Sequence, residues 1–263
     1  MLSTRSSALS KVAVTTCLAA AFFSQTLLAK DISRTFEVDH GGTLEVRTES
    51  GSINIETHDE KVVKVEIEVS GDDADDFEFE SKASGDDVFL VGEVENGRGW
   101  GRDLRVKFNI TVPEEYELDL RTSGGSISIE DLTGNVDANT SGGSITLGNI
   151  QGDVDVHTSG GSITTEAVYG AIDAHTSGGS IRTTFAKQIS KDAELRTSGG
   201  SITAYLAEDI AIDLRASTSG GRVKSQFDVD GRVKKKSIRG EINGGGPELS
   251  LVTSGGSIRI KKL

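Results

Sequence analysis

Apolar and polar residues alternate in short runs from Phe36 to Ile260, and no stretch between them repeats its apolar residues at helical spacing. Strict alternation is the pattern of a strand that buries one face and exposes the other to water. The pattern therefore predicts an all-β chain, a single elongated β structure with almost no helix.

One polar hexapeptide, Thr-Ser-Gly-Gly-Ser-Ile, punctuates this alternation. It begins at residues 122, 140, 158, 176, 197 and 253, returns as TSGGRV at 218, and is preceded by the related TESGSI at 48. Successive threonines from 122 to 176 lie 18 residues apart, and those from 176 to 218 lie 21 apart. Self-similarity at a fixed short period is the signature of a stacked repeat architecture.

Aligning the units on this threonine reveals three apolar columns. They lie four residues before it (Leu118, Val136, Val154, Ile172, Ala193, Leu214), two before it (Leu120, Ala138, Val156, Ala174, Leu195, Ala216) and five after it (Ile127, Ile145, Ile163, Ile181, Ile202, Val223). Each unit thus reads strand, turn, strand, turn. One unit buries too few aliphatic side chains to offset the entropy of ordering its backbone, so the units must stack.

We predict a β-solenoid, similar to a single-stranded β-helix, with coils of 18–21 residues. Equivalent residues of successive coils should lie about 4.8 Å apart. Residues 30–117 are expected to form an irregular N-terminal β part, 118–225 the regular repeats, and 226–263 a C-terminal hairpin and last coil. Together they are expected to form one domain, residues 30–263.

The Ser-Gly-Gly-Ser part of each hexapeptide is expected to form a corner between two strands. Glycine reaches positive φ without a Cβ penalty, so at least one glycine of each pair is expected there. The flanking hydroxyls are expected to hydrogen-bond backbone groups that the turn leaves unpaired. The predicted corner glycines are Gly124, Gly125, Gly142, Gly143, Gly160, Gly161, Gly178, Gly179, Gly199, Gly200, Gly220, Gly221, Gly255 and Gly256.

The first 29 residues have the features of a secretory signal peptide. Arg5 and Lys11 come before a mostly apolar run, which is followed by the small residue Ala29. This order of features predicts cleavage after Ala29. The mature protein is therefore expected to be exported, to the periplasm, to the cell surface or into the medium. No transmembrane segment is expected in the mature chain.

Composition narrows the possible chemistry. The only cysteine, Cys17, lies within the predicted signal peptide, which excludes a disulfide framework or a thiol nucleophile from the mature chain. The chain has 41 acidic against 28 basic residues and a formal net charge of −13. Such a charge repels phosphate backbones and argues against nucleic acid as a partner.

Acidic residues form a further column three residues before the threonine: Asp119, Asp137, Asp155, Asp173 and Glu194. Alternation places these side chains on the outer face, opposite the buried aliphatics. They could bind calcium between neighbouring coils, or form a solvated charged face that discourages sideways aggregation. The turns lack the aspartates of the calcium-binding β-roll repeat, GGxGxD, which favours the solvated face. No cofactor is expected.

Serine, histidine and aspartate recur together in units such as Asp155-Val156-His157-Thr158-Ser159. A catalytic triad, however, is one constellation placed once, with its base oriented by a third group. Here serine recurs in every coil, and the histidines alternate with residues that cannot act as a base. The chain is therefore not expected to be an enzyme.

Three segments together resemble the bacterial family of putative adhesins, an exported domain of unknown function with reiterated glycine-rich β-solenoid repeats. They are FEVDHGGTLEVRTESGSINIETHDE, VPEEYELDLRTSGGSISIEDLTGNVDANTSGGSITLGNIQGD and GRVKKKSIRGEINGGGPELSLVTSGGSIRIKK. The resemblance covers essentially all of residues 30–263. It implies an exported or envelope-associated β-solenoid and supplies no catalytic residues.

Two hypotheses of function follow. The first is a non-catalytic structural or interaction protein, an adhesin of the cell envelope whose β faces contact an envelope glycan or protein. The alternative is a polysaccharide-processing β-helix enzyme or a calcium-binding β-roll protein. Aromatic residues make up only 5% of the chain, which argues against sugar-stacking subsites and favours the first hypothesis.

Overall fold

The structure is a computed structural model that describes residues 30–95 and 103–263. The predicted signal peptide, residues 1–29, lies outside the described residues. Almost all the described structure is β, as the alternation predicts, and its only helix is a single 3₁₀ turn, η1 (Ala74–Asp76). No helix among these residues has the length and apolar character needed to cross a membrane.

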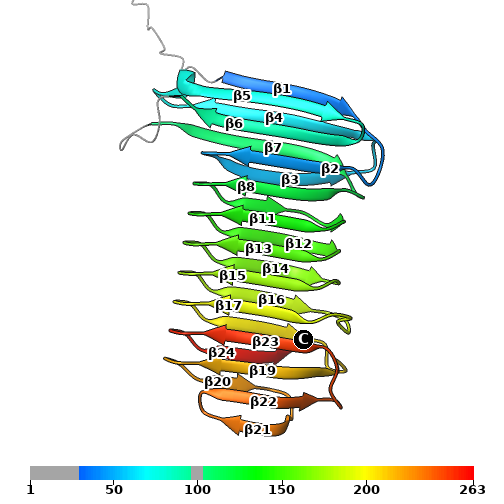
Figure 1. Ribbon diagram of the computed structural model, residues 1–263, viewed down its shortest axis with the longest axis vertical. Coiled ribbons are helices and arrows are strands. Elements are labelled where there is room, and N and C mark those ends of the chain that lie inside the picture. The colour runs from blue at the N-terminus through cyan, green and yellow to red at the C-terminus, as the bar shows by residue number, and fades with distance from the viewer. Residues whose placement is uncertain (1–29, 96–102) are drawn as a thin grey trace, which may run out of the picture.

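The strands form two long sheets that face each other along one axis (Figure 1). Sheet A contains, in spatial order, β1 (Lys30–Glu37), β4 (Val62–Ser70), β7 (Arg105–Pro113), β3 (Ser52–His58), β9 (Ile127–Ile129), β12 (Ile145–Gln151), β14 (Ile163–Val168), β16 (Ile181–Phe185), β18 (Ile202–Leu206), β24 (Ile258–Lys262) and β20 (Val223–Ser225), with β10 (Leu132–Thr133) beside β12. Sheet B contains β21 (Asp230–Lys234), β22 (Ser237–Ile242), β19 (Ile212–Thr218), β23 (Glu248–Thr253), β17 (Ala193–Thr197), β15 (Ile172–Thr176), β13 (Val154–Thr158), β11 (Val136–Thr140), β8 (Glu117–Thr122), β2 (Thr43–Thr48), β6 (Asp87–Val94) and β5 (Phe77–Ser84).

Each regular coil contributes one strand to sheet B and, after the hexapeptide, one strand to sheet A. Equivalent residues of successive coils pair in parallel, so that Val136, Val154 and Ile172 form one ladder. The isoleucines that follow the hexapeptide form another, and Ile163 within it has no exposed surface. These ladders fill the space between the sheets, which is the β-solenoid that the repeat predicts.

The two longer coils replace a glycine corner with a loop. The 18-residue coils turn back from sheet A to sheet B at Gly134, Gly152 and Gly170. In the loops between β16 and β17 and between β18 and β19, Ile189 and Ile210 are buried. Each loop therefore adds an apolar side chain to the core, which compensates for ordering the extra residues.

The coils at both ends of the stack are out of sequence order. The coil β2–β3 lies between β6–β7 and β8–β9, and β23–β24 lies between β17–β18 and β19–β20. Figure 1 shows this second insertion, where the C-terminal strands β23 and β24 lie above β19. Antiparallel strands close both sheets at one end, with β1 and β4 in sheet A and β5 in sheet B. At the other end β22 and β21 close sheet B, while sheet A ends at the parallel strand β20.

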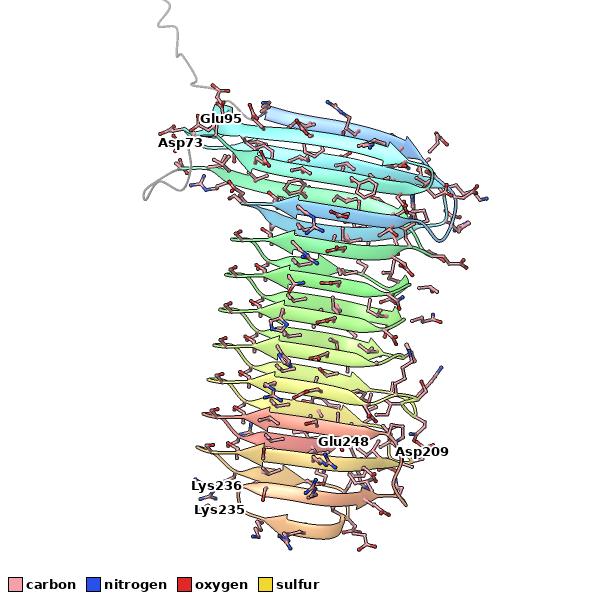
Figure 2. All side chains as sticks on the ribbon, viewed as in Figure 1. Asp73, Glu95, Asp209, Lys235, Lys236 and Glu248 are labelled. Atoms are coloured by element: carbon pink, nitrogen blue, oxygen red, sulfur yellow. The ribbon has the colours of Figure 1, made fainter. Side chains whose placement is uncertain are left out.

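The two ends of the stack differ in charge. Figure 2 shows Asp73 and Glu95 near the end that carries β1 and β5, and Lys235 and Lys236 near the end that carries β21. Because every interior coil has a neighbour on both sides, the edge strands of the described sheets lie at these ends, β1 and β5 at one and β20 and β21 at the other. Charged side chains on an edge discourage edge-to-edge association.

The threonine of the hexapeptide joins each corner to the neighbouring coil. Thr158 Oγ1 donates a 2.7 Å hydrogen bond to the carbonyl oxygen of Gly143 and accepts one from the N–H of Gly161 at 3.3 Å. Ser162 adds a second link, since its N–H donates to Ser144 Oγ at 3.2 Å. The threonine bonds recur at Thr122, Thr140, Thr176, Thr197, Thr218 and Thr253.

The expectation that each glycine pair includes a residue at positive φ is wrong. The glycines with positive φ lie elsewhere, at Gly41, Gly51, Gly71, Gly85, Gly134, Gly231, Gly244 and Gly245. In the seven hexapeptides, close stacking of the coils instead requires the second residue of each glycine pair to be glycine. A Cβ there would lie only 1.9–2.2 Å from a glycine carbonyl oxygen of the adjacent coil, well inside van der Waals contact.

This stacking makes the two glycines of one pair unequal, which Gly124 and Gly125 test. A Cβ on Gly125 would lie 1.9 Å from the carbonyl oxygen of Gly51, whereas one on Gly124 has nothing within 4 Å. We expect Gly125→Ala to lower the free energy of unfolding by about 1–3 kcal/mol or more, as overpacking does. Gly124→Ala should change it by less than about 0.5 kcal/mol. Thermal or urea unfolding measures both, and equal effects would contradict the stacking explanation.

Candidate functional site: an acidic groove on sheet B

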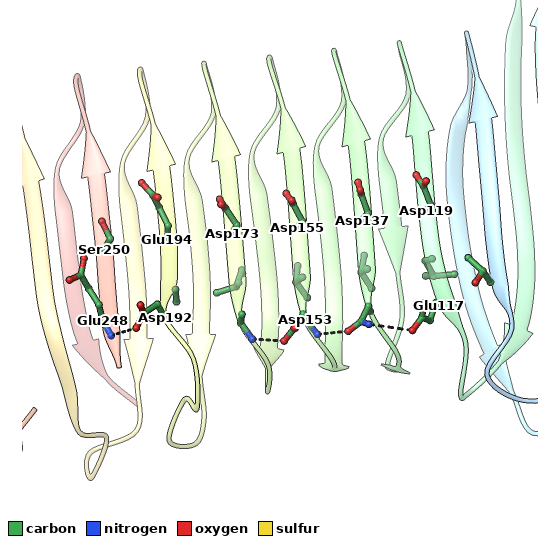
Figure 3. A pocket seen from close by; sticks show the side chains of 18 residues that line it. Glu117, Asp119, Asp137, Asp153, Asp155, Asp173, Asp192, Glu194, Glu248 and Ser250 are labelled. Carbon is green, nitrogen blue, oxygen red and sulfur yellow. Dashed lines mark hydrogen bonds between the residues drawn. The ribbon is translucent and has the colours of Figure 1, made fainter. Parts of the chain in front are cut away.

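A groove of about 720 Å³ runs along the outer face of sheet B, across β8, β11, β13, β15, β17 and β23 (Figure 3). Most of the polar side chains that line it are carboxylates, and none of its lining side chains is aromatic. Because the strands pair in register, each coil contributes the same positions to the groove. The groove is therefore a repeated surface that crosses many coils.

The acidic column of the repeat forms one wall of this groove. Asp119, Asp137, Asp155, Asp173 and Glu194 are aligned by strand pairing on the outer face of sheet B. The column continues to Glu45 in β2 and ends at Ser250 in β23. Figure 3 shows the side chains from Asp119 to Glu194, and that of Ser250, side by side with one on each strand.

A second column of polar residues lines the other side of the groove and was missed in the sequence. It contains Glu117, Asn135, Asp153, Asp192 and Glu248. These residues lie five positions before the threonine, so the same alternation that identified the first column could have identified this one. Its irregular composition, which includes Ala171, obscured the signal.

Hydrogen bonds between coils hold this second column. Asp153 Oδ1 accepts a 2.9 Å bond from the N–H of Ala171, and Asn135 Oδ1 accepts a 3.0 Å bond from the N–H of Asp153. Lys191 Nζ also donates to Asp153 Oδ2 at 2.7 Å. The bond from Lys191 and that from the Ala171 backbone lower the pKa of Asp153 below its usual value. Asp153 therefore stays ionised and stabilises the stack as an anion.

A third column, beside the acidic one, supplies partial compensation of its charge. It contains Arg47, Arg121, Asn139, His157, His175 and Arg196. Arg121 Nε lies 3.0 Å from Asp119 Oδ1, and Arg196 Nε lies 3.0 Å from Glu194 Oε1. In the middle of the array, where the column has asparagine and histidine, the carboxylates have weaker counter-charges.

Two carboxylates in the middle of the groove, Asp137 and Asp173, have raised pKa values. Burial raises the pKa of Asp137, with a further contribution from the nearby Asp119, while Arg121 opposes the shift. Burial also raises the pKa of Asp173, where Asp155 and Glu194 add to the effect and His175 opposes it. Burial, with a smaller contribution from like charges at coil spacing, therefore makes ionisation of Asp137 and Asp173 less favourable than in water.

Asp173, His175 and Glu194 are the group of described side chains that best matches a metal site, with donor atoms within 4.8 Å of one another. The two carboxylates of this group already have close polar neighbours. His175 Nε2 lies 3.0 Å from Asp173 Oδ1, and Glu194 accepts a hydrogen bond from Arg196. Calcium takes six to eight oxygen ligands, so these residues supply an incomplete set for that ion.

The groove also lacks the arrangement that nucleophilic catalysis needs. The ring of His175 lies against that of His157, with centroids 4.8 Å apart, and beside Asp173. Among the described residues, no serine hydroxyl is hydrogen-bonded to either histidine. A serine nucleophile requires such a base within hydrogen-bond reach.

These features define a class of protein, a two-sheet β-solenoid with a repeated polar outer face. The chain belongs to the family described as Toastrack DUF4097, which it matches over residues 42–169 and again over 152–261. The two matches together span both the irregular N-terminal part and the regular coils. No curated protein sequence matches the chain.

Solved structures similar to the chain include three from bacteria. A putative cell adhesion protein from Clostridium sporogenes ATCC 15579 is 15% identical, with 89% of this chain and 100% of that chain covered and a TM-score of 0.41. A putative adhesin from Bacteroides fragilis NCTC 9343 is 15% identical, with 89% and 97% covered and a TM-score of 0.45. A putative adhesin from Parabacteroides merdae ATCC 43184 is 10% identical, with 88% and 96% covered and a TM-score of 0.37.

The raised pKa values of Asp137 and Asp173 predict a pH-dependent stability. Because they exceed the about 3.9 of an unfolded aspartate, their contribution favours folding below that pH and is lost as the pH rises through the folded-state values. We expect Asp137→Asn with Asp173→Asn to raise the free energy of unfolding at neutral pH by about 0.2–1 kcal/mol per site. The gain should vanish at about pH 3 in urea unfolding curves.

Asp153→Asn is the matched control in the same groove, because the pKa of Asp153 is lowered instead. It should destabilise the protein at neutral pH, and this loss should shrink as the pH falls through the folded-state pKa of Asp153. The account is wrong if all three substitutions shift stability in the same direction.

Proposed function

We propose that the protein is an exported, non-catalytic interaction protein of the bacterial cell envelope, an adhesin that holds an extended polymer in the groove of sheet B. The observation that carries the proposal is the groove itself, which presents carboxylates at the same position on successive coils. A polymer with a short repeat can contact many coils at once, and weak contacts then add along its length.

The chemistry of the lining favours a particular kind of ligand. Carboxylate oxygens accept hydrogen bonds from hydroxyl and ammonium groups, and the raised pKa values of Asp137 and Asp173 are relieved by a cation nearby. An envelope glycan that bears amino groups, or a basic protein segment, satisfies both conditions. The absence of aromatic rings from the lining makes polar contacts, and not stacking on sugar faces, the source of affinity.

Export is supported by the predicted signal peptide. Envelope location is supported by membership of the Toastrack DUF4097 family together with the resemblance to exported adhesin-like proteins. Both point to a protein that works outside the cytoplasm.

Glucosamine oligomers provide a direct test, because chitosan carries ammonium groups that its N-acetylated counterpart, chitin oligosaccharide, lacks. We expect calorimetry near pH 5.5, where the amines are charged and most carboxylates are ionised, to detect binding of chitosan only. Asp137→Asn, Asp155→Asn and Asp173→Asn together should weaken it by about tenfold or more. Reducing-end assays should detect no cleavage of either oligomer.

The matched control removes three carboxylates from the opposite face. Glu56, Glu130 and Glu166 are exposed on the outer face of sheet A, so Glu→Gln at all three removes the same amount of negative charge as the groove variant. Binding by this variant should equal that of the wild type. Equal loss in both triple variants would show non-specific charge attraction, and released reducing ends would support the enzymatic alternative.

A further inference from the structure

Two departures from the repeat meet at one corner of the C-terminal end. In the coil β19–β20 the hexapeptide reads TSGGRV, so Arg222 stands where other coils have a serine such as Ser257. Lys224 pairs with Arg259 of β24 on the outer face of sheet A, and the next coil has Thr203 at this position. Three cations thus replace the small hydroxyl side chains of the regular coils.

The turn of the β21–β22 hairpin adds two more cations to this corner. The N–H of Thr218 donates to the Lys236 carbonyl oxygen at 2.9 Å, and that of Val223 donates to the Lys235 carbonyl oxygen at 3.0 Å. Lys236 Nζ also donates to the Ser219 carbonyl oxygen at 2.5 Å. These bonds fix the lysine turn against the variant hexapeptide. Figure 2 labels Lys235 and Lys236 at this end of the stack.

No carboxylate of the described residues forms an ion pair with the cations of this corner. The ion pairs among the described residues engage carboxylates with other basic residues, and none of them includes Arg222, Lys224, Lys235, Lys236 or Arg259. Such a concentration of positive charge is unexpected in a chain of net charge −13. Mutual repulsion of five cations costs stability unless an anion is present.

A small cavity of about 170 Å³ lies among these cations, lined by Arg222, Lys224, Ser257, Ile258 and Arg259. Its volume is below the about 300–1,000 Å³ of pockets for drug-sized ligands, and suits one small anion. Ser257 Oγ accepts the N–H of Arg222 at 3.2 Å, which leaves its own hydrogen available to a ligand. Guanidinium groups donate paired hydrogen bonds that match the oxygens of phosphate.

We propose that this corner, lined by Arg222, Lys224, Ser257 and Arg259 and flanked by Lys235 and Lys236, binds a phosphate-type oxyanion, the phosphate or sulfate group of a larger ligand. The site is separate from the groove, because it lies on the outer face of sheet A at the C-terminal end. Anionic ligands are repelled by the carboxylates of sheet B, so they approach the protein at this end.

The test uses substitutions that restore the residues of regular coils. Arg222→Ser with Arg259→Thr makes the corner resemble Ser201 and Thr203 of the coil β17–β18, so folding should be preserved. Arg182→Thr is the matched control, since Arg182 lies in the same column two coils from Arg259. The amide NMR signals of Gly221 to Lys224 are followed during titration with sodium phosphate, against sodium chloride at equal ionic strength.

We expect saturable shifts with phosphate in the wild type and in Arg182→Thr, and at least about tenfold weaker binding in the double variant. Arg222→Lys with Arg259→Lys keeps the charge but loses the paired donors, and should bind with intermediate affinity. The proposal is overturned if chloride produces the same shifts, or if the double variant binds phosphate as the wild type does.

Vesicles distinguish the source of the phosphate group. Flotation with vesicles of phosphatidylglycerol and phosphatidylcholine, but not with phosphatidylcholine alone, would identify a lipid headgroup as a ligand, provided the double variant stays unbound. Phosphate binding without flotation would identify a soluble or polymer-borne phosphate group. The site is refuted if neither free phosphate nor the anionic vesicles bind. The groove variants of sheet B should behave as the wild type in both assays, so this site and the proposed function can fail separately.

Discussion

The closeness with which successive coils meet at the hexapeptide corner controls the rest of the structure. A Cβ on Gly161 would lie 2.1 Å from the carbonyl oxygen of Gly143, so only glycine allows the two backbones to stack there. The buried hydroxyl of Thr158 then bridges the same carbonyl and the N–H of Gly161. Steric fit and hydrogen bonding therefore select the same register, and a shifted coil would lose both.

This register determines the chemistry of the outer faces. Once one corner is aligned on the next, every residue of a strand lies beside its equivalent, and any residue type in the repeat becomes a column. The acidic position becomes a continuous groove wall, where burial, with a further contribution from neighbouring carboxylates, raises the pKa of Asp137 and Asp173. Where the repeat changes, as at Arg222, the column changes with it, and the C-terminal corner acquires a different chemistry.

Much of this could be predicted from the sequence, because period and alternation are local properties. The position of Ile163 in a buried ladder, and of Asp155 on the outer face, follows directly from counting residues around a threonine. The role of glycine was predicted for the wrong reason. Positive φ is a property of one residue, whereas the constraint on Gly161 comes from a carbonyl group of another coil.

The spatial order of the end coils could not be predicted. The hexapeptides at Thr48 and Thr253 are similar to the others, so local sequence does not say which coil each will pair with. The structure inserts β2–β3 and β23–β24 between other coils, and antiparallel strands lie at both ends. The same non-local pairing brings Lys235 against Val223, a contact that no spacing in the chain reveals.

If coil register controls the fold, the number of residues removed matters more than their identity. Deleting residues 145–162 removes one full period of 18 residues and joins Ser144 to Ile163, which restores an intact hexapeptide. We expect this variant to unfold cooperatively in a thermal melt monitored by circular dichroism, at a somewhat lower temperature because one stacking interface is lost. Deleting 145–161, one residue fewer, should abolish the cooperative transition. Similar cooperative melts for both deletions would contradict the account.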